Sequence, residues 1–327
     1  MSSLPNKLQE ILKSIQVTDE EYDNAISKHE EVRKAILQNI TGYPLITGSY
    51  AKKTGIKPLN DVDILVWLPK SFAGISSIDR INGADPRQVL KKMKTITKNL
   101  KIDHEAIRPQ NHSLGIQYRG DAFRIDLIPG FAEEDPTGSN DFNRLFWTPD
   151  KETGKWLNSH PKADKARMIA ANAKGNQLVI PVLQLLKVWK NQITSKSFKS
   201  YHLECLLVYL AFYKPSLFNS DFYSVFRNTV TEMLELVEKD TDIVSTLKLE
   251  NDVVAYLREQ EGRRQRCIRE MQHLKDTLDR IAQVSQQDAN RAINELEGSF
   301  SRKSNQKGQR HTKVSPEPDN RRFGYGR

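Results

Sequence analysis

The pattern of apolar and polar residues along the chain separates a strand-rich part from a helix-rich part. Between residues 43 and 128, short apolar runs bounded by Gly, Pro, Asn or Asp predict strands. Amphipathic stretches predict two helices in the same part, over 18–40 and 85–100. A mixed sheet with helices packed behind it is an α+β architecture. The predicted strands cover residues 43–47, 62–68, 102–107, 113–118 and 122–128.

The two helices of this part have recognisable starts. The first begins with a capping box, in which Thr18 and Glu21 satisfy each other's backbone N–H groups, and it ends before Gly42. The second has Pro86 at its first position, where proline is favoured. Their apolar residues recur at near-helical spacing, which predicts the buried faces: Tyr22, Ala25, Ile26, Val32, Ala35 and Ile36 in the first helix, and Val89, Met93, Ile96 and Leu100 in the second.

The chain from about residue 161 onward is predicted to be helical, because its apolar residues recur every three or four positions. In the helix 177–192, Gln184, Lys187 and Asn191 fall on a polar stripe apart from the apolar one, so Lys187 is expected to be presented rather than buried. The helix 201–213 is apolar nearly all round and is predicted to be buried, with Ser200 as its N-cap. The predicted helices cover residues 162–174, 177–192, 201–213, 222–246 and 251–297.

The last predicted helix carries a seam of apolar residues at heptad spacing. The seam spans only about two heptads, fewer than the three to four that indicate a coiled coil. A helix docked along the body of the protein is therefore favoured over a dimer zipper, which stays open as the alternative. The seam residues are Cys267, Met271, Leu274, Leu278 and Ile281.

Composition limits the class of protein. With 38% hydrophobic and 28% charged residues, no apolar run as long as a membrane span and no signal-peptide core, the 327-residue chain is expected to be cytoplasmic, with no membrane partner. Its two cysteines, Cys205 and Cys267, lie in apolar helical patterns, and the absence of a CxxC or Cys/His cluster argues against zinc.

The net charge of +9 is concentrated at one end of the chain. Residues 301–327 hold eight Lys and Arg and two acids, so they account for six of the nine charges. Such a tail is compatible with a nucleic acid or another negatively charged partner, but a solvated, disordered tail over 299–327 is the favoured interpretation.

The candidate chemistry lies on the predicted strands. Side chains alternate along a strand, so Asp61 and Asp63 share one face, roughly 7 Å apart at the usual rise per residue. Two carboxylates so placed repel each other unless a cation lies between them. Asp126 falls on the polar face of the strand 122–128, and it reaches the same place if the two strands are neighbours.

Three carboxylates on adjacent strands can hold two divalent cations, the arrangement that clamps attacking and leaving oxygens in phosphoryl transfer. Gly48 and Ser49 form a turn that offers backbone N–H groups and a hydroxyl to phosphates. Lys52, Lys53 and Lys57 follow, either near those phosphates or in a solvated loop. The plain alternative for the acids is a set of surface carboxylates on half-buried strands.

The segments GSY, DVD and IDLIP resemble the nucleotidyltransferase superfamily of DNA polymerase β. More narrowly, they resemble the branch with oligoadenylate synthetase, cyclic GMP–AMP synthase and the bacterial CD-NTases of CBASS antiphage defence. The resemblance implies a catalytic sheet lobe over 1–160, a helical lobe over 161–298, and an active site in the cleft between them. It also implies two Mg²⁺ ions, or Mn²⁺, on Asp61, Asp63 and Asp126.

The helical lobe carries further matches. Lys187 in LLKVWK corresponds to a family lysine that touches the donor triphosphate, although an ordinary surface lysine is the alternative. Ser200 and Tyr201 in SYHL resemble a signature in which the serine contacts phosphates and the tyrosine stacks on a base; a capped core helix with a packing tyrosine is the alternative. His160, between the halves, is expected to be structural rather than catalytic.

The resemblance implies an enzyme that joins ATP or other NTPs into a cyclic di- or trinucleotide and releases pyrophosphate, in antiphage signalling. It also implies an effector protein that responds to the product, and regulatory proteins. Two alternatives remain: a template-independent transferase that adds nucleotides to RNA or protein, and an inactive nucleotide- or nucleic-acid-binding module. Three mutually repelling acids argue against the inactive module, and the small charge of the body gives little support to a polymer groove.

Overall fold

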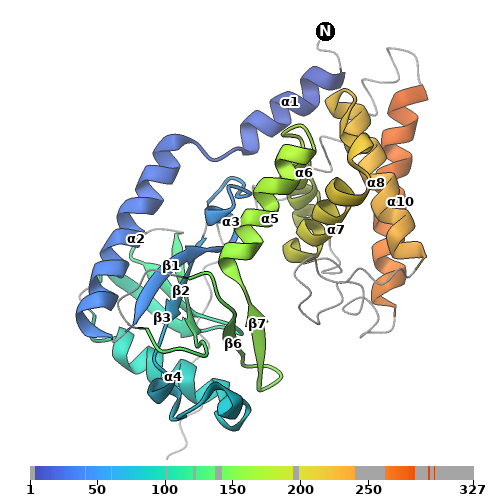
Figure 1. Ribbon diagram of the computed structural model, residues 1–327. Helices are drawn as coiled ribbons and strands as arrows, with labels where there is room; N and C mark the ends of the chain where they lie inside the picture. Colours follow the sequence, from blue (N-terminus) through green and yellow to red (C-terminus); the bar gives the residue numbers. More distant parts are fainter. Residues whose placement is uncertain are drawn as a thin grey trace, which may run out of the picture.

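The computed structural model describes residues 4–40, 42–59, 61–100, 102–120, 123–136, 142–193, 199–239 and 262–283, together with Asn294 and Gly298. The described chain forms a lobe built on a β-sheet and a lobe built only of helices, with α5 leading from the first into the second (Figure 1). The basic tail predicted to be disordered lies outside the described residues.

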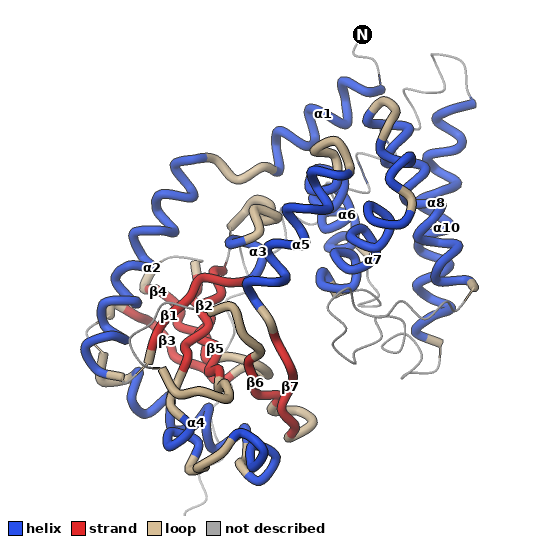
Figure 2. The backbone as a smooth tube through the Cα atoms, viewed as in Figure 1, coloured by secondary structure: helices blue, strands red, loops and turns tan. Residues whose placement is uncertain are grey.

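The sheet lobe contains a five-stranded mixed sheet in the order β1-β2-β5-β4-β3. The strands gather in this lobe, as Figure 2 shows in red. β2 and β5 are parallel, and every other pair in the sheet is antiparallel. The central place of β2 and β5 agrees with their apolar runs, because a strand with neighbours on both sides is the most buried part of a sheet. The strands are β1 (Tyr43–Thr47), β2 (Asp61–Trp67), β3 (His104–Pro109), β4 (Leu114–Tyr118) and β5 (Arg124–Gly130).

The two faces of β2 enter different clusters, as side-chain alternation predicts. Val62, Ile64 and Val66 join the main core of the lobe, which also takes residues from α2 (Asp19–Asn39) and α4 (Pro86–Thr97). On the other face, Leu65 and Trp67 join a smaller cluster. The carboxylates Asp61 and Asp63 continue this second face toward the start of the strand.

Both helix starts in this lobe follow the sequence signals. Thr18 and Glu21 form the predicted capping box at the start of α2, and Asp85 caps α4 with Pro86 at the first position. The predicted buried face of α2 was wrong at one position. Ile26 is 44% exposed, because the helix turns its neighbour Ala25 toward the sheet instead.

One hairpin was not predicted. β6 (Phe146–Asp150) and β7 (Lys155–Ser159) form a two-stranded antiparallel sheet between β5 and α5. An isolated bridge between Phe131 and Trp147 attaches it to the end of β5. The hairpin then leads into α5, so it forms part of the connection between the lobes (Figure 1).

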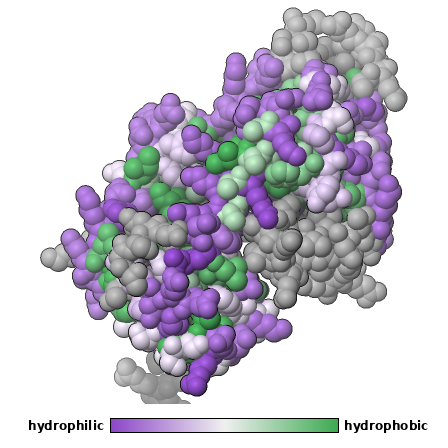
Figure 3. Space-filling view, in the orientation of Figure 1, coloured by the Kyte–Doolittle hydropathy of each residue, from purple (hydrophilic) through white to green (hydrophobic). Residues whose placement is uncertain are grey.

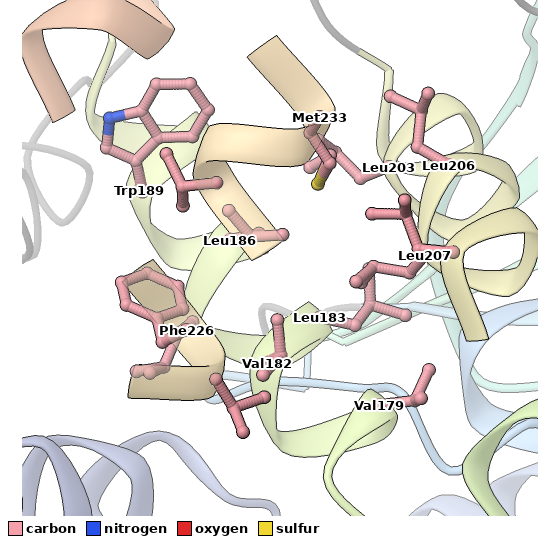
Figure 4. Close-up of a cluster of buried hydrophobic side chains, with 14 of the residues drawn as sticks. Val179, Val182, Leu183, Leu186, Trp189, Leu203, Leu206, Leu207, Phe226 and Met233 are labelled. Atoms are coloured by element: carbon pink, nitrogen blue, oxygen red, sulfur yellow. The ribbon is translucent and has the colours of Figure 1, made fainter. Parts of the chain in front are cut away.

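The helical lobe has one continuous core. Side chains of α6 point toward those of α7 and α8, with Leu186 and Leu207 among the residues at the centre (Figure 4). Leu8 of α1 is fully buried in the same core, so the first helix of the chain packs with the last ones. The helices of this lobe are α1 (Leu4–Ile15), α5 (Pro161–Lys174), α6 (Val179–Gln192), α7 (Ser200–Tyr213), α8 (Phe222–Glu238) and α10 (Arg263–Gln283).

The apolar seam of the last described helix is buried within the chain. All five seam residues, from Cys267 to Ile281, are at most 4% exposed, and α10 packs along α8. The prediction of a helix docked along the body is therefore confirmed for residues 263–283. The seam residues are covered within the chain and are not available to pair with a second chain. The rest of the predicted helix 251–297 lies outside the described residues, apart from Gly262 and Asn294.

The hydrophilic surface and the burial of the two cysteines agree with what the amino-acid sequence predicts. Cys205 and Cys267 are buried free thiols. Hydrophilic residues cover much of the face shown in Figure 3, with apolar areas scattered between them. Of the helices that the structure describes, none combines the length and hydrophobicity needed to cross a bilayer.

Candidate active site

The parallel pairing of β2 with β5 brings the acidic residues together. In this register Asp63 lies directly opposite Asp126, and Asp61 lies opposite Arg124. Since residues opposite each other in a sheet point to the same side, the three carboxylates lie on one face at the start of the two strands. The predicted convergence of Asp126 on Asp61 and Asp63 is thus what the fold produces.

A cation lies between two of these acids, and it comes from the chain itself. Arg124 Nε donates to Asp126 Oδ1 at 2.7 Å, and its terminal amino group donates to Asp126 Oδ2 at 3.2 Å. The same amino group donates to Asp61 Oδ2 at 3.0 Å. Gln110 Nε2 adds a hydrogen bond to Asp126 Oδ1 at 3.0 Å. The guanidinium therefore bridges the two strands through their carboxylates.

The third acid, Asp63, differs from the other two in its electrostatic surroundings, and this changes its pKa. Burial raises the pKa of Asp63 to about 7, and the nearby charges of Asp61 and Asp126 add to the rise. Burial also raises the pKa of Asp126, although the charge and hydrogen bonds of Arg124 oppose that effect. Without another cation, Asp63 therefore keeps its proton to a higher pH than an exposed aspartate does.

Gly48 and Ser49 lie next to this cluster, at the start of a four-residue helix, α3 (Gly48–Ala51), rather than in a simple turn. Thr47, the last residue of β1, is paired with Asp63, so the chain leaves the sheet at the carboxylates. Gly48 has a positive φ of 67°, and a Cβ added to it would lie 1.9 Å from Asp63 Oδ2. Only glycine tolerates both the positive φ and the close approach of the Asp63 carboxylate at this position.

Lys187 is not presented to solvent, and the prediction from the polar stripe was wrong. The side chain is only 4% exposed, because the loop after α3 covers this face of α6. Lys187 Nζ donates to Thr54 O at 3.1 Å, to Thr54 Oγ1 at 2.9 Å and to Glu204 Oε1 at 2.9 Å. An ammonium group has three N–H donors, so each has a partner within the protein.

Glu204 of α7 pairs with one lysine from each lobe. Its second oxygen, Oε2, accepts a hydrogen bond from Lys52 of the sheet lobe, while Oε1 holds Lys187 of the helical lobe. Burial alone would raise the pKa of Glu204, but the two ammonium groups outweigh burial and hold it below its usual value. Lys52 is thus part of a buried ion-pair network, not of a solvated loop.

Ser200 and Tyr201 open α7 on the opposite side of the cavity. Ser200 is the first helical residue and not the N-cap; that position belongs to Lys199, which makes no side-chain cap. Ser200 Oγ instead accepts a hydrogen bond from Lys190 Nζ at 3.0 Å. Tyr201 is 38% exposed, so its ring is accessible and not a core residue.

A cavity of about 490 Å³ connects these groups. Its walls come from both lobes, which is the expected position of the active site between a sheet lobe and a helical lobe. All the predicted site residues except Asp126 line it; Asp126 lies beneath, with its carboxylate held by Arg124. The lining residues with candidate roles are Gly48, Ser49, Lys52, Asp61, Asp63, Lys187, Ser200, Tyr201 and Glu204.

A family model for the Second Messenger Oligonucleotide or Dinucleotide Synthetase domain, SMODS, matches residues 1–172, more than half of the chain. The chain belongs to this family. The matched segment contains β2, β5 and α3 and therefore all three acids with the adjoining Gly48 and Ser49. Membership of the CD-NTase branch, expected from GSY, DVD and IDLIP, is confirmed.

Individual relatives agree with the family. The chain is 23% identical over 181 residues to a probable cyclic nucleotide synthase of Bacillus cereus (strain VD146), a match covering 49% of this chain and 53% of the relative. It is 26% identical over 238 residues to the CCA-adding enzyme of Sulfurisphaera tokodaii, covering 72% of this chain and 50% of that enzyme. The matches thus span about half the length of these curated relatives.

The fold is shared with a solved structure. The structure of CdnC from E. coli MS115-1 with ATP superimposes with a TM-score of 0.66 at 16% identity, covering 90% of this chain and 96% of CdnC. Because the likeness covers the helical lobe as well as the sheet lobe, it establishes the two-lobed fold. The polymerase-β-like architecture expected from the sequence is therefore confirmed.

The SMODS domain of this chain offers donors suited to a hard divalent cation, because Asp61, Asp63 and Asp126 supply only carboxylate oxygens. In the present arrangement, however, Arg124 engages Asp61 and both oxygens of Asp126. Across the part of the chain that is described, no group of three or more His, Cys, Asp or Glu side chains is arranged to hold a metal ion. The donors fit magnesium or manganese, and a cation that uses Asp61 Oδ2 or the oxygens of Asp126 has to compete with Arg124 for them.

Sequence reasoning missed two residues of this SMODS site. Arg124 precedes Asp126 by two positions on the same strand face, and that spacing was the available signal. Glu204 lies in an apolar helix, where an isolated acid signals a buried ion pair. His160 is structural as expected, since its ring nitrogen accepts the N–H of Ala163 and caps α5.

Proposed function

We propose that this chain is a nucleotidyltransferase that joins ATP or other NTPs into a cyclic di- or trinucleotide and releases pyrophosphate. The observation that carries the proposal is the Asp63–Asp126 register of β2 and β5 at one end of a cavity shared by both lobes. Membership of the SMODS family and the likeness to a probable cyclic nucleotide synthase support the same reaction class.

One wall of the cavity is proposed to bind the donor triphosphate. Gly48 and Ser49 present backbone N–H groups and a hydroxyl to the donor triphosphate. Lys52 brings positive charge to the same wall, and its pairing with Glu204 fixes its position. Lys187 supports this wall from behind through Thr54, in place of the direct contact implied by the family resemblance.

Base binding is assigned to the opposite wall. Tyr201 offers an accessible ring, and stacking on an aromatic ring holds a base with little dependence on its identity. Ser200, one residue earlier, places its hydroxyl at the start of α7, where phosphate oxygens are favoured. The acceptor and donor nucleotides would thus be held between the two lobes.

Proton removal is assigned to Asp126. Its buried carboxylate has a raised pKa, which makes it a better base than an exposed aspartate. Two Mg²⁺ ions, or Mn²⁺, held by Asp61, Asp63 and Asp126 would activate the attacking ribose hydroxyl and neutralise the leaving pyrophosphate. A second joining reaction in the same cavity would close the ring.

The test is direct. The purified chain is incubated with Mg²⁺ and the four NTPs, treated with phosphatase and analysed by mass spectrometry. A phosphatase-resistant cyclic product made by the wild type and by Asp103→Asn, but lost in Asp126→Asn, is the expected result. Asp103 is a suitable control because its side chain is 72% exposed and forms a surface ion pair with Arg119 at 3.1 Å. A chain that binds NTPs without turnover would support the inactive module instead.

A second candidate function is the addition of nucleotides to RNA, favoured by the match to a CCA-adding enzyme over 72% of this chain. The same incubation with labelled NTPs and added RNA distinguishes the two. Label that appears in RNA and not in a small product supports the RNA-directed reaction.

The proposed signalling role needs partners. We propose an effector protein that binds the cyclic product, with antiphage defence as the setting and regulatory proteins acting on the enzyme. Support for this part comes from the family alone, and the measurement is protection of a host from phage by the wild type but not by Asp126→Asn. The proposed nucleic-acid contact of the basic tail falls on residues outside those described.

A further inference from the structure

Arg124 holds the two strands of the carboxylate site together, and its two contacts differ in burial. Toward Asp126 the guanidinium makes two hydrogen bonds, at 2.7 and 3.2 Å, to a side chain that is only 9% exposed. Toward Asp61 it makes one bond, at 3.0 Å, to a side chain that is 46% exposed. The Asp126 contact is therefore the stronger of the two, since exposed ion pairs contribute little.

The neighbouring strand is shaped to hold the arginine in this position. Gly115 of β4 is the register partner of Asp126, and a Cβ added to it would lie 3.0 Å from Arg124 Cδ. The same Cβ would lie 2.5 Å from Gln110 Nε2. The missing side chain at position 115 leaves the space in which Arg124 and Gln110 both reach Asp126.

These contacts explain why the acids are close but do not form a ready metal site. Asp61 Oδ2 is occupied by the guanidinium, and a cation that uses this oxygen has to compete with it. Positive charge at the site also disfavours a second positive ion at short range. The Asp61 contact is the one that a cation breaks more readily, because it is a single, partly exposed bond, whereas two bonds hold the arginine on the buried Asp126.

We infer that Arg124 is a positioning residue with two functions: it keeps Asp126 in place at all times, and it neutralises Asp61 until a divalent cation displaces it from that oxygen. The inference rests on the proposed function, in which these acids hold the cations. It adds an exchange between a side chain and a metal ion as a step before the nucleotide reaction. Metal binding without nucleotide is expected to be weak in the wild type.

The test measures Mn²⁺ binding to the nucleotide-free protein by the loss of the free-ion electron paramagnetic resonance signal. Arg124→Met is expected to bind Mn²⁺ about tenfold more tightly than the wild type, the factor expected when one charge-assisted hydrogen bond no longer competes. Its turnover is expected to fall, because Asp126 loses its two bonds. Tighter metal binding with slower turnover is a pair of changes that a general loss of structure would not give.

Two further variants make the test decisive. Arg119→Met removes an arginine from an exposed pair with Asp103 and is expected to leave Mn²⁺ binding unchanged. Arg124→Lys keeps the charge but loses the paired guanidinium contact with the two oxygens of Asp126. Its Mn²⁺ affinity is therefore expected to lie between those of the wild type and Arg124→Met, and it replaces Arg124→Met in the test if that variant does not fold. Circular dichroism checks folding of each variant.

The inference is overturned if folded Arg124 variants bind Mn²⁺ no more tightly than the wild type, including the case in which none of them binds it. Its failure is separable from that of the proposed function, because product formation is measured on the same wild-type preparation. A wild type that makes the cyclic product while Arg124→Met shows unchanged Mn²⁺ affinity refutes only the role of Arg124.

Discussion

Gly48 and Asp63 lie so close together that a Cβ on residue 48 would stand 1.9 Å from Oδ2 of Asp63. This close approach joins the start of α3 to the central carboxylate of the site. It exists because β1 and β2 pair up to Thr47 and Asp63, and the chain then turns through a positive φ at Gly48. The turn and the acid are therefore one structural unit.

Gly48→Ala is expected to abolish activity and to destabilise the fold by about 1–3 kcal/mol, because it adds both backbone strain and a clash. The matched control is Gly74→Ala. Gly74 has a similar φ of 75°, but a Cβ added there meets nothing within 4 Å. Gly74→Ala should lose only the stability that the backbone strain costs, and it should keep full activity. Equal effects of the two substitutions on stability and turnover would contradict the prediction; denaturant unfolding and product assays decide.

Asp63 is expected to make metal-free stability depend on pH. Its folded-state pKa is raised to about 7, above the ordinary aspartate value, so the folded protein binds this proton more tightly than the unfolded chain. The stabilisation is present at about pH 4 and is lost as the pH rises through about 7. Asp63→Asn should remove this pH-dependent stabilisation. The melting temperature of the variant relative to that of the wild type should therefore rise between pH 4 and pH 7.

The measurement is a series of thermal melts in chelator-treated buffer, with Asp103→Asn as the control for removing an exposed aspartate. Other groups titrate in this window: burial lowers the pKa of His202 to about 3. Their effects cancel in the comparison of wild type with Asp63→Asn. A constant difference between the two proteins across the window would show that Asp63 is not protonated in the fold.

Glu204→Gln is expected to destabilise the protein by about 3–5 kcal/mol, because it leaves two buried ammonium groups without their shared counter-ion. The double variant Glu204→Gln with Lys187→Gln should recover part of this loss. Glu235→Gln is the control, since Glu235 pairs with Lys239 at 2.9 Å on the surface, and it should cost less than about 1 kcal/mol. Urea unfolding of the four proteins gives the comparison, and similar losses for Glu204 and Glu235 would refute it.

Tyr201→Ala is expected to raise the KM for NTPs by roughly tenfold, the factor that corresponds to the lower part of the range for base–aromatic stacking. Tyr201→Phe should keep the wild-type KM, because the ring remains. Tyr213→Ala, which removes a more exposed tyrosine outside the cavity, serves as the control. An unchanged KM in Tyr201→Ala would return Tyr201 to the role of a packing residue.

Leu278→Ala is expected to destabilise the helical lobe by about 2–5 kcal/mol, because Leu278 is fully buried where α10 meets α8. The loss should not depend on protein concentration, since the seam is covered within one chain. His273→Ala on the exposed side of α10 should change stability by less than about 0.5 kcal/mol. A loss that shrinks as concentration rises would point to the zipper.

Local signals in the sequence were enough for most elements. Strand β1 has the predicted bounds, the capping box begins α2, and Pro86 begins α4. The hairpin β6–β7 was missed because its strands are short and contain Pro149 and polar residues. The pairing of such strands depends on contacts between segments, which the local pattern does not report.

Periodicity also had a specific failure at Lys187. The helical spacing correctly separated this residue from the apolar stripe of α6, but it could not show what covers the polar stripe. Thr54, more than a hundred residues earlier in the chain, lies over it and accepts two hydrogen bonds from the ammonium group. Burial of a polar face depends on another part of the chain supplying partners.

The sequence by itself determined that Asp61 and Asp63 share a face and that Asp126 lies on the polar face of its own strand, because alternation is a property of the strand backbone. Only the tertiary structure decided that β5 runs beside β2 in the register that sets Asp126 opposite Asp63, and that Arg124 occupies the space between the acids. Strand order and register depend on which distant segments bury each other's apolar faces, and that choice is made by the whole fold.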